Sequence, residues 1–276
     1  MRLKKIFLAI GIIAVIVSCA TNPFTGKKTM ALVSNDQLFP AAFAQYSQVL
    51  NENKVITGTS DSDMITRVGQ RIAVAAERWL NANGYQGYLE DYKWEYKLIE
   101  SEQVNAWCMP GGKIAFYTGI LPIAQNETGV AAIMGHEVAH ALANHGQQRM
   151  SSGMLQQAGG VAVAVATGNE SAEKQQMWMQ AYGLGTTVGM VLPFSRGHET
   201  EADKIGLYLM AIAGYNPDEA AELWKRMKAN SGGEAPPEFL STHPSNDSRI
   251  QNLKALAPKA KAEARKFGVT SFRPIN

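Results

Sequence analysis

The segment from Ala131 to Leu142 places three ionisable side chains in an otherwise apolar stretch. It reads AAIMGHEVAHAL and contains His136, Glu137 and His140. Positions four residues apart project from the same face of an α-helix, one turn apart. A helix of this composition is buried, and burying two histidines and a glutamate is costly unless they are paired or bound to a metal. The segment therefore predicts a buried helix whose two imidazoles converge on one metal ion.

Glu137 follows the first histidine directly, where its carboxylate can accept a proton from a metal-bound water. Zinc can lower the pKa of such a water to roughly 7. Glu137 is then a candidate general base that takes the proton as water attacks a peptide carbonyl and delivers it to the leaving amine. A chance match on an amphipathic helix is the alternative, which the apolar surroundings disfavour. His145, one turn further on, is more typical of a solvated or helix-end histidine than of a ligand.

A third metal ligand is expected downstream, because a catalytic zinc takes three protein ligands and keeps one open position. The segment HETEAD, residues 198–203, offers carboxylates at Glu199, Glu201 and Asp203. Glu199 and Asp203 share one helix face, and Glu201 points elsewhere. Glu199 can bind the zinc, while Asp203 can hydrogen-bond a histidine ring and orient it. The alternative is an acidic helix start that faces water, which the helix dipole favours.

Several segments accompany these two in a fixed order along the chain. They are NPFTG at 22–26, NAWCMPGG at 105–112, GHEVAH at 135–140, ETEAD at 199–203, and His243-Pro244 with Arg249. In this order they resemble the HtpX, Oma and CAAX-prenyl-protease type of gluzincin metallopeptidase, and in particular its soluble periplasmic lipoprotein branch (BepA- and LoiP-like). The resemblance implies one catalytic zinc ion held by His136, His140 and Glu199.

The same resemblance brings two further residues to the zinc cleft. His243 could bind zinc as a latent fourth ligand or stabilise the oxyanion of the transition state, and Arg249 could assist with that charge. A loop histidine before a helix start is the alternative for His243. The strand around Asn105 and Ala106 would lie at the rim, where an exposed edge can hold an extended peptide by main-chain pairing.

The N-terminal residues are typical of a secretion signal. Basic residues at 2, 4 and 5 precede an apolar run from Ile6 to Val17, which is of signal-peptide length. Ser18-Cys19 resembles the end of a bacterial lipobox, so we expect Cys19 to become the lipidated first residue. An ordinary signal peptide cut near Ala20 is the alternative. Several acyl chains on one cysteine would give stable anchoring, and Ala20 weakly favours the outer membrane facing the periplasm.

Composition excludes some partners and bonds. The formal net charge is only +2 and the basic residues are spread out, which argues against nucleic-acid binding. The chain has two cysteines. If Cys19 carries lipid, Cys108 has no partner for an intramolecular disulfide.

Hydrophobic periodicity predicts a mainly α chain. Alternation predicts strands near 93–99, 103–109 and 113–118, which would form a small antiparallel sheet beside the helix that carries His136. Helices are predicted near 36–51, 61–83, 127–149, 172–190, 198–213, 217–230 and 246–268. The expected class is α+β, mainly α, with a zincin-like metallopeptidase domain. We expect a signal peptide over 1–18, a lipidated tether over 19–35 and a single metallopeptidase domain over 36–276.

Two functions remain open at this point. The first is a zinc-dependent endopeptidase that hydrolyses unfolded or misassembled cell-envelope proteins, with the membrane contacted through the lipid anchor. The second is a zinc-stabilised, proteolytically latent chaperone or binding protein for outer-membrane assembly. The presence of Glu137 argues for the first, because a purely structural zinc site needs no base.

Overall fold

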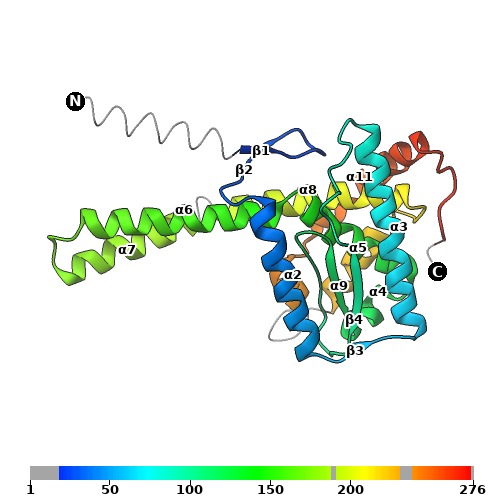
Figure 1. The fold of residues 1–276 in the computed structure, drawn as a ribbon, viewed down its shortest axis with the longest axis horizontal. Helices are drawn as coiled ribbons and strands as arrows, with labels where there is room; N and C mark the ends of the chain where they lie inside the picture. The colour runs from blue at the N-terminus through cyan, green and yellow to red at the C-terminus, as the bar shows by residue number, and fades with distance from the viewer. Residues whose placement is uncertain (1–18, 188–190, 231–237, 275–276) are drawn as a thin grey trace. The chain divides into compact units, whose positions relative to one another are not determined.

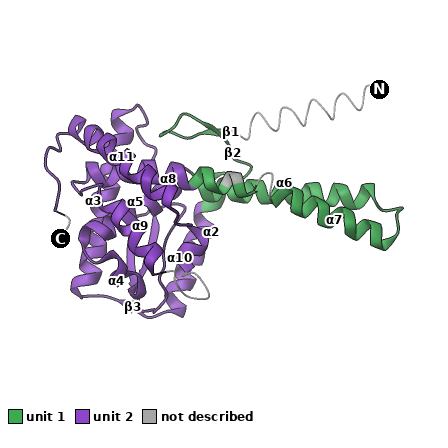
Figure 2. Cartoon of the chain, turned by 180° about the vertical axis from the view of Figure 1, so that it is seen from behind, with its two compact units in different colours: residues 1–38, 144–198 green, residues 39–143, 199–276 purple. Residues whose placement is uncertain are grey.

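The computed structural model describes residues 19–187, 191–230 and 238–274 (Figure 1). The expected signal peptide over 1–18 lies outside these residues. The chain divides into two compact units: unit 1 comprises residues 1–38 and 144–198, and unit 2 comprises residues 39–143 and 199–276 (Figure 2). The expectation of a single domain over 36–276 stays a prediction.

Unit 2 is mainly helical, as its sequence periodicity predicts. Helix α3 (Ser60–Ala82) begins at a capping box between Thr59 and Ser62, and it buries the apolar residues that recur at helical spacing. Helix α5 (Glu127–Leu142) begins where the Asn126 side chain accepts a hydrogen bond from the Gly129 amide. The other elements of the unit are η1 (Thr118–Ile120), α4 (Leu121–Ala124), α9 (Glu219–Ala229), α10 (Glu238–Thr242) and α11 (Asp247–Lys266).

Helices α2 (Asn35–Glu52) and α8 (Leu192–Ile212) each run from one unit into the other. The sequence predicts both, although α8 begins six residues before the expected His198. With this helix content and one small sheet in unit 2, the predicted class of α+β, mainly α, is confirmed.

The sheet of unit 2 is mixed, so the prediction of a purely antiparallel sheet is wrong. Its order is β3 (Val55–Ile56), β4 (Glu95–Ile99), β6 (Lys113–Tyr117) and β5 (Ala106–Met109), and β4 pairs parallel with β6. The chain reverses twice between β4 and β6, the second time at Gly111 and Gly112, which both have positive φ. Strand β6 therefore returns in the direction of β4 and pairs with it, which leaves β5 at the edge.

The helix predicted over 127–149 is two helices, so the expectation of one continuous helix is wrong. Helix α5 ends at Leu142, and α6 (His145–Ala166) begins after Asn144, whose φ is 56°. Asparagine tolerates this left-handed conformation better than most residues, and it ends the helix without a glycine. The helix that carries His136 and His140 therefore stops just after His140.

Unit 1 combines the expected tether with the segment after α5. Strands β1 (Cys19–Thr21) and β2 (Lys28–Met30) pair antiparallel, and α6 packs against α7 (Ala172–Thr186) as a helical hairpin. His145 begins α6 and is buried, with its ring stacked on His198 at a centroid distance of 3.9 Å. The expectation of a helix-end histidine is confirmed, and that of a solvated one is wrong. No helix within the described part of the chain is both long enough and apolar enough to cross a bilayer.

Candidate metal centre

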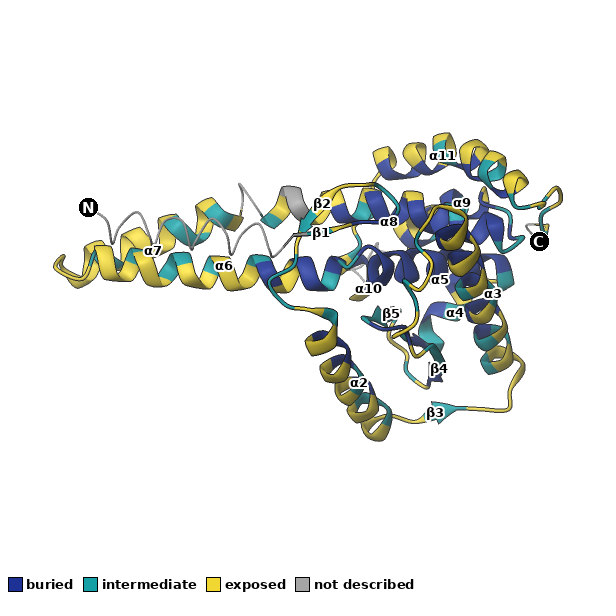
Figure 3. Ribbon diagram, turned by 45° about the horizontal axis from the view of Figure 1, so that its top comes forward, coloured by how far each residue is buried: buried dark blue, intermediate teal, exposed yellow. Residues whose placement is uncertain are grey.

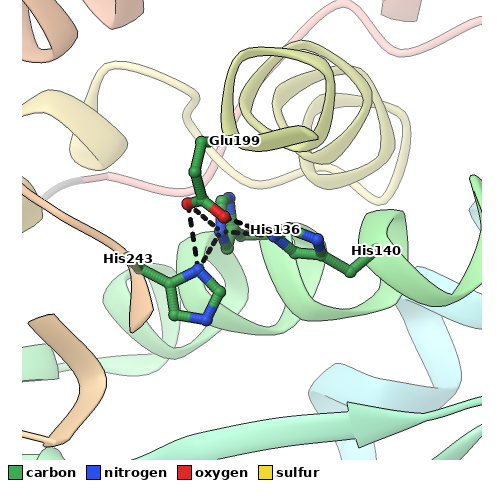
Figure 4. A group of neighbouring side chains, drawn as sticks. All are labelled: His136, His140, Glu199 and His243. Atoms are coloured by element: carbon green, nitrogen blue, oxygen red, sulfur yellow. Dashed lines mark hydrogen bonds and ion pairs between the residues drawn. The ribbon is translucent and has the colours of Figure 1, made fainter. Parts of the chain in front are cut away.

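Four side chains of unit 2 point their donor atoms toward one another (Figure 4). His136 and His140 come from α5, Glu199 comes from α8, and His243 follows α10 directly. One ligand atom from each of them lies within 4.8 Å of all the others. Local helix spacing accounts for the two histidines of α5, but Glu199 and His243 arrive from distant parts of the sequence.

The contacts inside this cluster are short. The Nε2 atoms of His136 and His140 lie 3.1 Å apart, and the two carboxylate oxygens of Glu199 lie 3.3 and 3.2 Å from them. The Nδ1 atom of His243 lies 3.1 Å from His136 Nε2 and 2.9 Å from Glu199 Oε2. His136 and His140 are buried, and Glu199 and His243 are largely buried. Nitrogen and carboxylate donors thus converge on one point.

A glycine pair brings the two ligand-bearing helices together. A Cβ atom added at Gly206 of α8 would lie 2.8 Å from the carbonyl carbon of Gly135 and from the amide nitrogen of His136. A Cβ atom added at Gly135 would lie 2.8 Å from the carbonyl oxygen of Gly206. Neither position has room for a methyl group, so α5 and α8 cross with their backbones in contact. The sequence places Gly206 on the packing side of its helix, one turn beyond Asp203, but it did not indicate the close contact with Gly135.

Asp203 lies beside His136, on the side away from the cluster. Its Oδ1 atom is 3.0 Å from His136 Nδ1. The guanidinium of Arg249 donates to both carboxylate oxygens of Asp203 at 2.8 and 2.7 Å, and its Nη1 atom lies 3.1 Å from Glu199 Oε2. This guanidinium also stacks 3.6 Å above the buried ring of Trp224, a residue that no sequence signal indicated. Arg249 thus contacts the carboxylates of both Glu199 and Asp203, and its predicted contact with substrate stays a prediction.

The charges of the cluster shift the pKa values of its members. Burial lowers the pKa of His136, but hydrogen bonds to Asp203 and Glu199 outweigh burial and raise that pKa to about 9. Burial dominates at His140 and lowers its pKa well below the ordinary value. Burial opposes ionisation of Glu199 and Asp203, yet their histidine and arginine partners hold both carboxyl pKa values low. Both carboxylates are therefore ionised at neutral pH.

Glu137 is buried next to the cluster, and its Oε1 atom lies 3.5 Å from His243 Nε2. Nearby, burial and the charge of Glu137 raise the pKa of the Cys108 thiol on β5. Strand β5 is the edge of the sheet, as expected for a peptide-binding rim. Asn105 precedes it and accepts a hydrogen bond from the amide of Tyr117, while Ala106 is buried. Binding of substrate by these two residues stays a prediction.

The family of the chain follows from a match to peptidase family M48 over residues 65–257, which is more than half of the chain and includes every member of the cluster. The chain belongs to peptidase family M48. The predicted gluzincin resemblance is thereby confirmed, and the M48 match covers α3 through most of α11.

Curated relatives agree with this M48 membership. The mitochondrial metalloendopeptidase OMA1 of Schizosaccharomyces pombe is 36% identical over 63% of this chain and 50% of its own length. Human mitochondrial metalloendopeptidase OMA1 is 26% identical over 87% of this chain and 46% of its own length. The beta-barrel assembly-enhancing protease of Yersinia pestis is 26% identical over 87% of this chain and 48% of its own length. The chain thus spans about half the length of the curated relatives it matches.

The donor set fits zinc, the metal that M48 metallopeptidases use. Two imidazoles and one carboxylate are a common ligand set for catalytic zinc. The three side chains are buried or largely buried, and their donor atoms approach within 3.3 Å of one another. Asp203 holds the second ring nitrogen of His136, an arrangement that orients histidine ligands in zinc sites.

Proposed function

We propose that this protein is a zinc-dependent endopeptidase that hydrolyses peptide bonds of unfolded or misassembled cell-envelope proteins. The observation that carries the proposal is the convergence of His136, His140 and Glu199 with Glu137 buried beside them. In this proposal the first three bind the zinc ion and Glu137 is the general base. The names of the relatives, metalloendopeptidase and beta-barrel assembly-enhancing protease, support peptide hydrolysis and an envelope substrate.

Each residue of the site has a separate task in the proposed reaction. Bound zinc supplies Lewis acidity, which activates water and polarises the peptide carbonyl. Glu137 takes a proton from the attacking water and gives it to the leaving amine. Asp203 holds the Nδ1 side of His136 and so fixes the direction of the ring. Arg249, a predicted substrate contact, holds the carboxylates of Asp203 and Glu199 in place.

The position of β5 at the edge of the sheet favours an unfolded polypeptide as the substrate. The outer side of β5 carries main-chain groups that an extended peptide can pair with, largely independent of its sequence. Asn105 and Ala106 stand at the start of this strand. An enzyme that recognises the main chain acts on any polypeptide that has lost its fold. For location, we propose that Cys19 carries lipid and holds the protein on the bacterial envelope, facing the periplasm.

Cleavage of an unfolded protein tests the proposal. The protein, its Glu137→Gln variant and the protein treated with a chelator are incubated with reduced, unfolded casein, and fragments are measured by gel electrophoresis. Loss of the base should lower the rate at least about 100-fold, with zinc content unchanged. Readdition of zinc should restore the chelated sample. Equal cleavage by wild type and Glu137→Gln would refute the assigned base.

A second function is favoured by the position of His243. Its Nδ1 atom lies as close to His136 and Glu199 as the other donors do, so it can supply a fourth ligand. A zinc ion with four protein ligands is typical of a structural site. The protein would then be a latent chaperone or binding protein for outer-membrane assembly. Cleavage of casein by the His243→Ala variant alone would indicate a latent enzyme. Absence of cleavage by both the wild type and this variant would favour the binding protein.

A further inference from the structure

The hairpin of α6 and α7 in unit 1 exposes an apolar surface. From residue 152 to residue 187 no side chain is buried (Figure 3). Eight large apolar side chains of this hairpin are 40–77% exposed: Met154, Leu155, Val161, Val165, Met177, Trp178, Met179 and Leu184. Single exposed apolar residues are normal, but eight on one hairpin are unusual, and extensive exposed apolar surface marks a site that binds a partner.

Charged residues are absent from most of the length of both arms of this hairpin in the sequence. Residues 150–169 and 175–195 contain no Asp, Glu, Lys, Arg or His, and the charged residues Glu170, Glu173 and Lys174 gather at the turn. A helix that faces water usually carries charged residues on its exposed side. Glutamine, serine and glycine take their place here. The composition of the arms therefore suits contact with an apolar medium over most of their length.

The two helices pack on each other through small and polar residues, which turns the large apolar ones outward. Gln156 donates to the Thr186 hydroxyl, and the hydroxyl of Tyr182 donates to the carbonyl of Gln156. A Cβ atom at Gly159 would lie 2.1 Å from the Tyr182 hydroxyl, so the helices approach closely at this glycine. The hairpin is thus held together while Met154, Val161, Val165, Met177 and Trp178 stay exposed.

The base of the hairpin is joined to the N-terminal segment within the same unit. The Leu32 amide donates to Ser151 Oγ, and the Gln147 side chain donates to the carbonyl of Val33. The apolar run from Ile6 to Val17 ends two residues before Cys19, where this segment begins. In the proposed function Cys19 carries acyl chains, which would hold the start of this segment at a membrane, and the present inference rests on that proposal. The apolar hairpin would then belong to the unit that carries the membrane attachment.

We propose that the α6–α7 hairpin lies on the lipid bilayer, with its apolar side chains in the interfacial region, as a second membrane contact beside the N-terminal anchor. The apolar run at residues 158–166 is too short to span a bilayer, so the hairpin lies on the membrane and does not cross it. Trp178 and Tyr182 are residues that favour the membrane interface. The anchor raises the effective concentration of bilayer around the hairpin, so a weak intrinsic affinity suffices.

Fluorescence in vesicles tests this proposal. The full-length, lipid-modified protein is reconstituted into vesicles of phosphatidylcholine and phosphatidylethanolamine, in a Cys108→Ala background. An environment-sensitive dye is attached at Leu184→Cys on the hairpin. The matched control is Val74→Cys, an apolar position on α3 of unit 2 that is 54% exposed. Quenching by lipid-borne nitroxide is measured at both positions at low and high salt.

Quenching at position 184 should exceed quenching at position 74 at least about threefold, and salt should leave it unchanged because no basic residue contributes. Replacing Leu155 and Val161 with Glu should reduce quenching at 184 to the level at 74 while cleavage of casein is retained. Equal quenching at the two positions overturns the proposal. A dye response that needs added unfolded polypeptide, or that rises with protein density in the vesicle, also overturns it, in favour of a substrate-binding arm or self-association.

Discussion

Replacement of Gly206 with Ala tests whether the contact between α5 and α8 builds the metal site. Gly206 binds no metal in our proposal, and it lies seven residues after Glu199 on the same helix. The added methyl would meet the backbone of Gly135 and His136 at 2.8 Å. Ordinary contacts between such atoms are about 3.5–4.0 Å, so the helices must separate by roughly 0.7–1.2 Å. Glu199 moves away from the histidines by a similar amount.

This displacement costs the fold little stability, but it is large compared with the variation that metal–ligand distances tolerate. Overpacking costs about 1–3 kcal/mol, and replacing a helical glycine with alanine returns about 1 kcal/mol, so the net loss of stability is roughly 0–2 kcal/mol. Metal–ligand distances in contrast are held to about 0.2 Å. We therefore expect Gly206→Ala to weaken zinc binding about 10–100-fold, the range found when the surroundings of zinc ligands are changed.

Competition with a chromophoric chelator measures zinc affinity, and urea unfolding measures stability. Gly197→Ala is the control, because it lies on the same helix and a Cβ atom there meets nothing within 4 Å. Gly197→Ala should keep wild-type affinity. Gly135→Ala, which would meet the carbonyl of Gly206, should behave like Gly206→Ala. Zinc affinity of Gly206→Ala within twofold of wild type would refute the argument.

Three further predictions concern the charged groups of unit 2. Asp203→Asn should lower zinc affinity about 10–100-fold in the same competition assay, because an amide holds the His136 ring less firmly than a carboxylate. Arg249→Met should destabilise the protein by about 3–5 kcal/mol in urea unfolding, because it leaves the buried Asp203 carboxylate without its bidentate partner, and a loss under about 1 kcal/mol would contradict this. Burial raises the pKa of Glu127, but hydrogen bonds and ion pairs with three partners outweigh burial and hold this pKa below its ordinary value. The partners are Arg67, Tyr215 and Arg273. A lowered folded-state pKa gives stability that is present above the unfolded-state pKa and lost as the pH falls through the folded-state value, so Glu127→Gln should flatten the fall in unfolding free energy below about pH 5.

Local patterns in the sequence predict well where single helices and strands lie. They predict poorly how an element pairs with others or continues into the next. The helix expected over 61–83 is α3 at Ser60–Ala82, because apolar period and capping residues act within one turn. Alternation in β4 and β6 indicates which face is buried, but it carries no information on which strand pairs with which. The parallel pairing of β4 and β6 depends on two chain reversals whose directions the sequence does not specify. The break at Asn144 was hidden for a similar reason, since apolar and polar residues continue at helical spacing across it.

The features of the site likewise divide into those that local patterns predict and those that depend on tertiary contacts. His136 and His140 could be paired from their spacing alone, and Glu199 and Asp203 could be placed on one helix face. That the two helices meet came from resemblance, because their contact is tertiary. Arg249 shows the limit of such reasoning. The resemblance placed it at the zinc cleft, but its bidentate contact with Asp203 depends on where the first turn of α11 lies.

Gly206 explains why one contact of this site was missed, although the residue itself was expected on the packing side of its helix. A search for chemistry in a sequence looks for donors, acceptors and nucleophiles, whereas Gly206 contributes by lacking a side chain where α8 touches α5. It follows Asp203 by three residues and Glu199 by seven, which keeps all three on the face of α8 that meets the histidine helix. Ligand, orienting carboxylate and contact glycine therefore form one helical stripe, and the glycine sets how closely the other two approach His136.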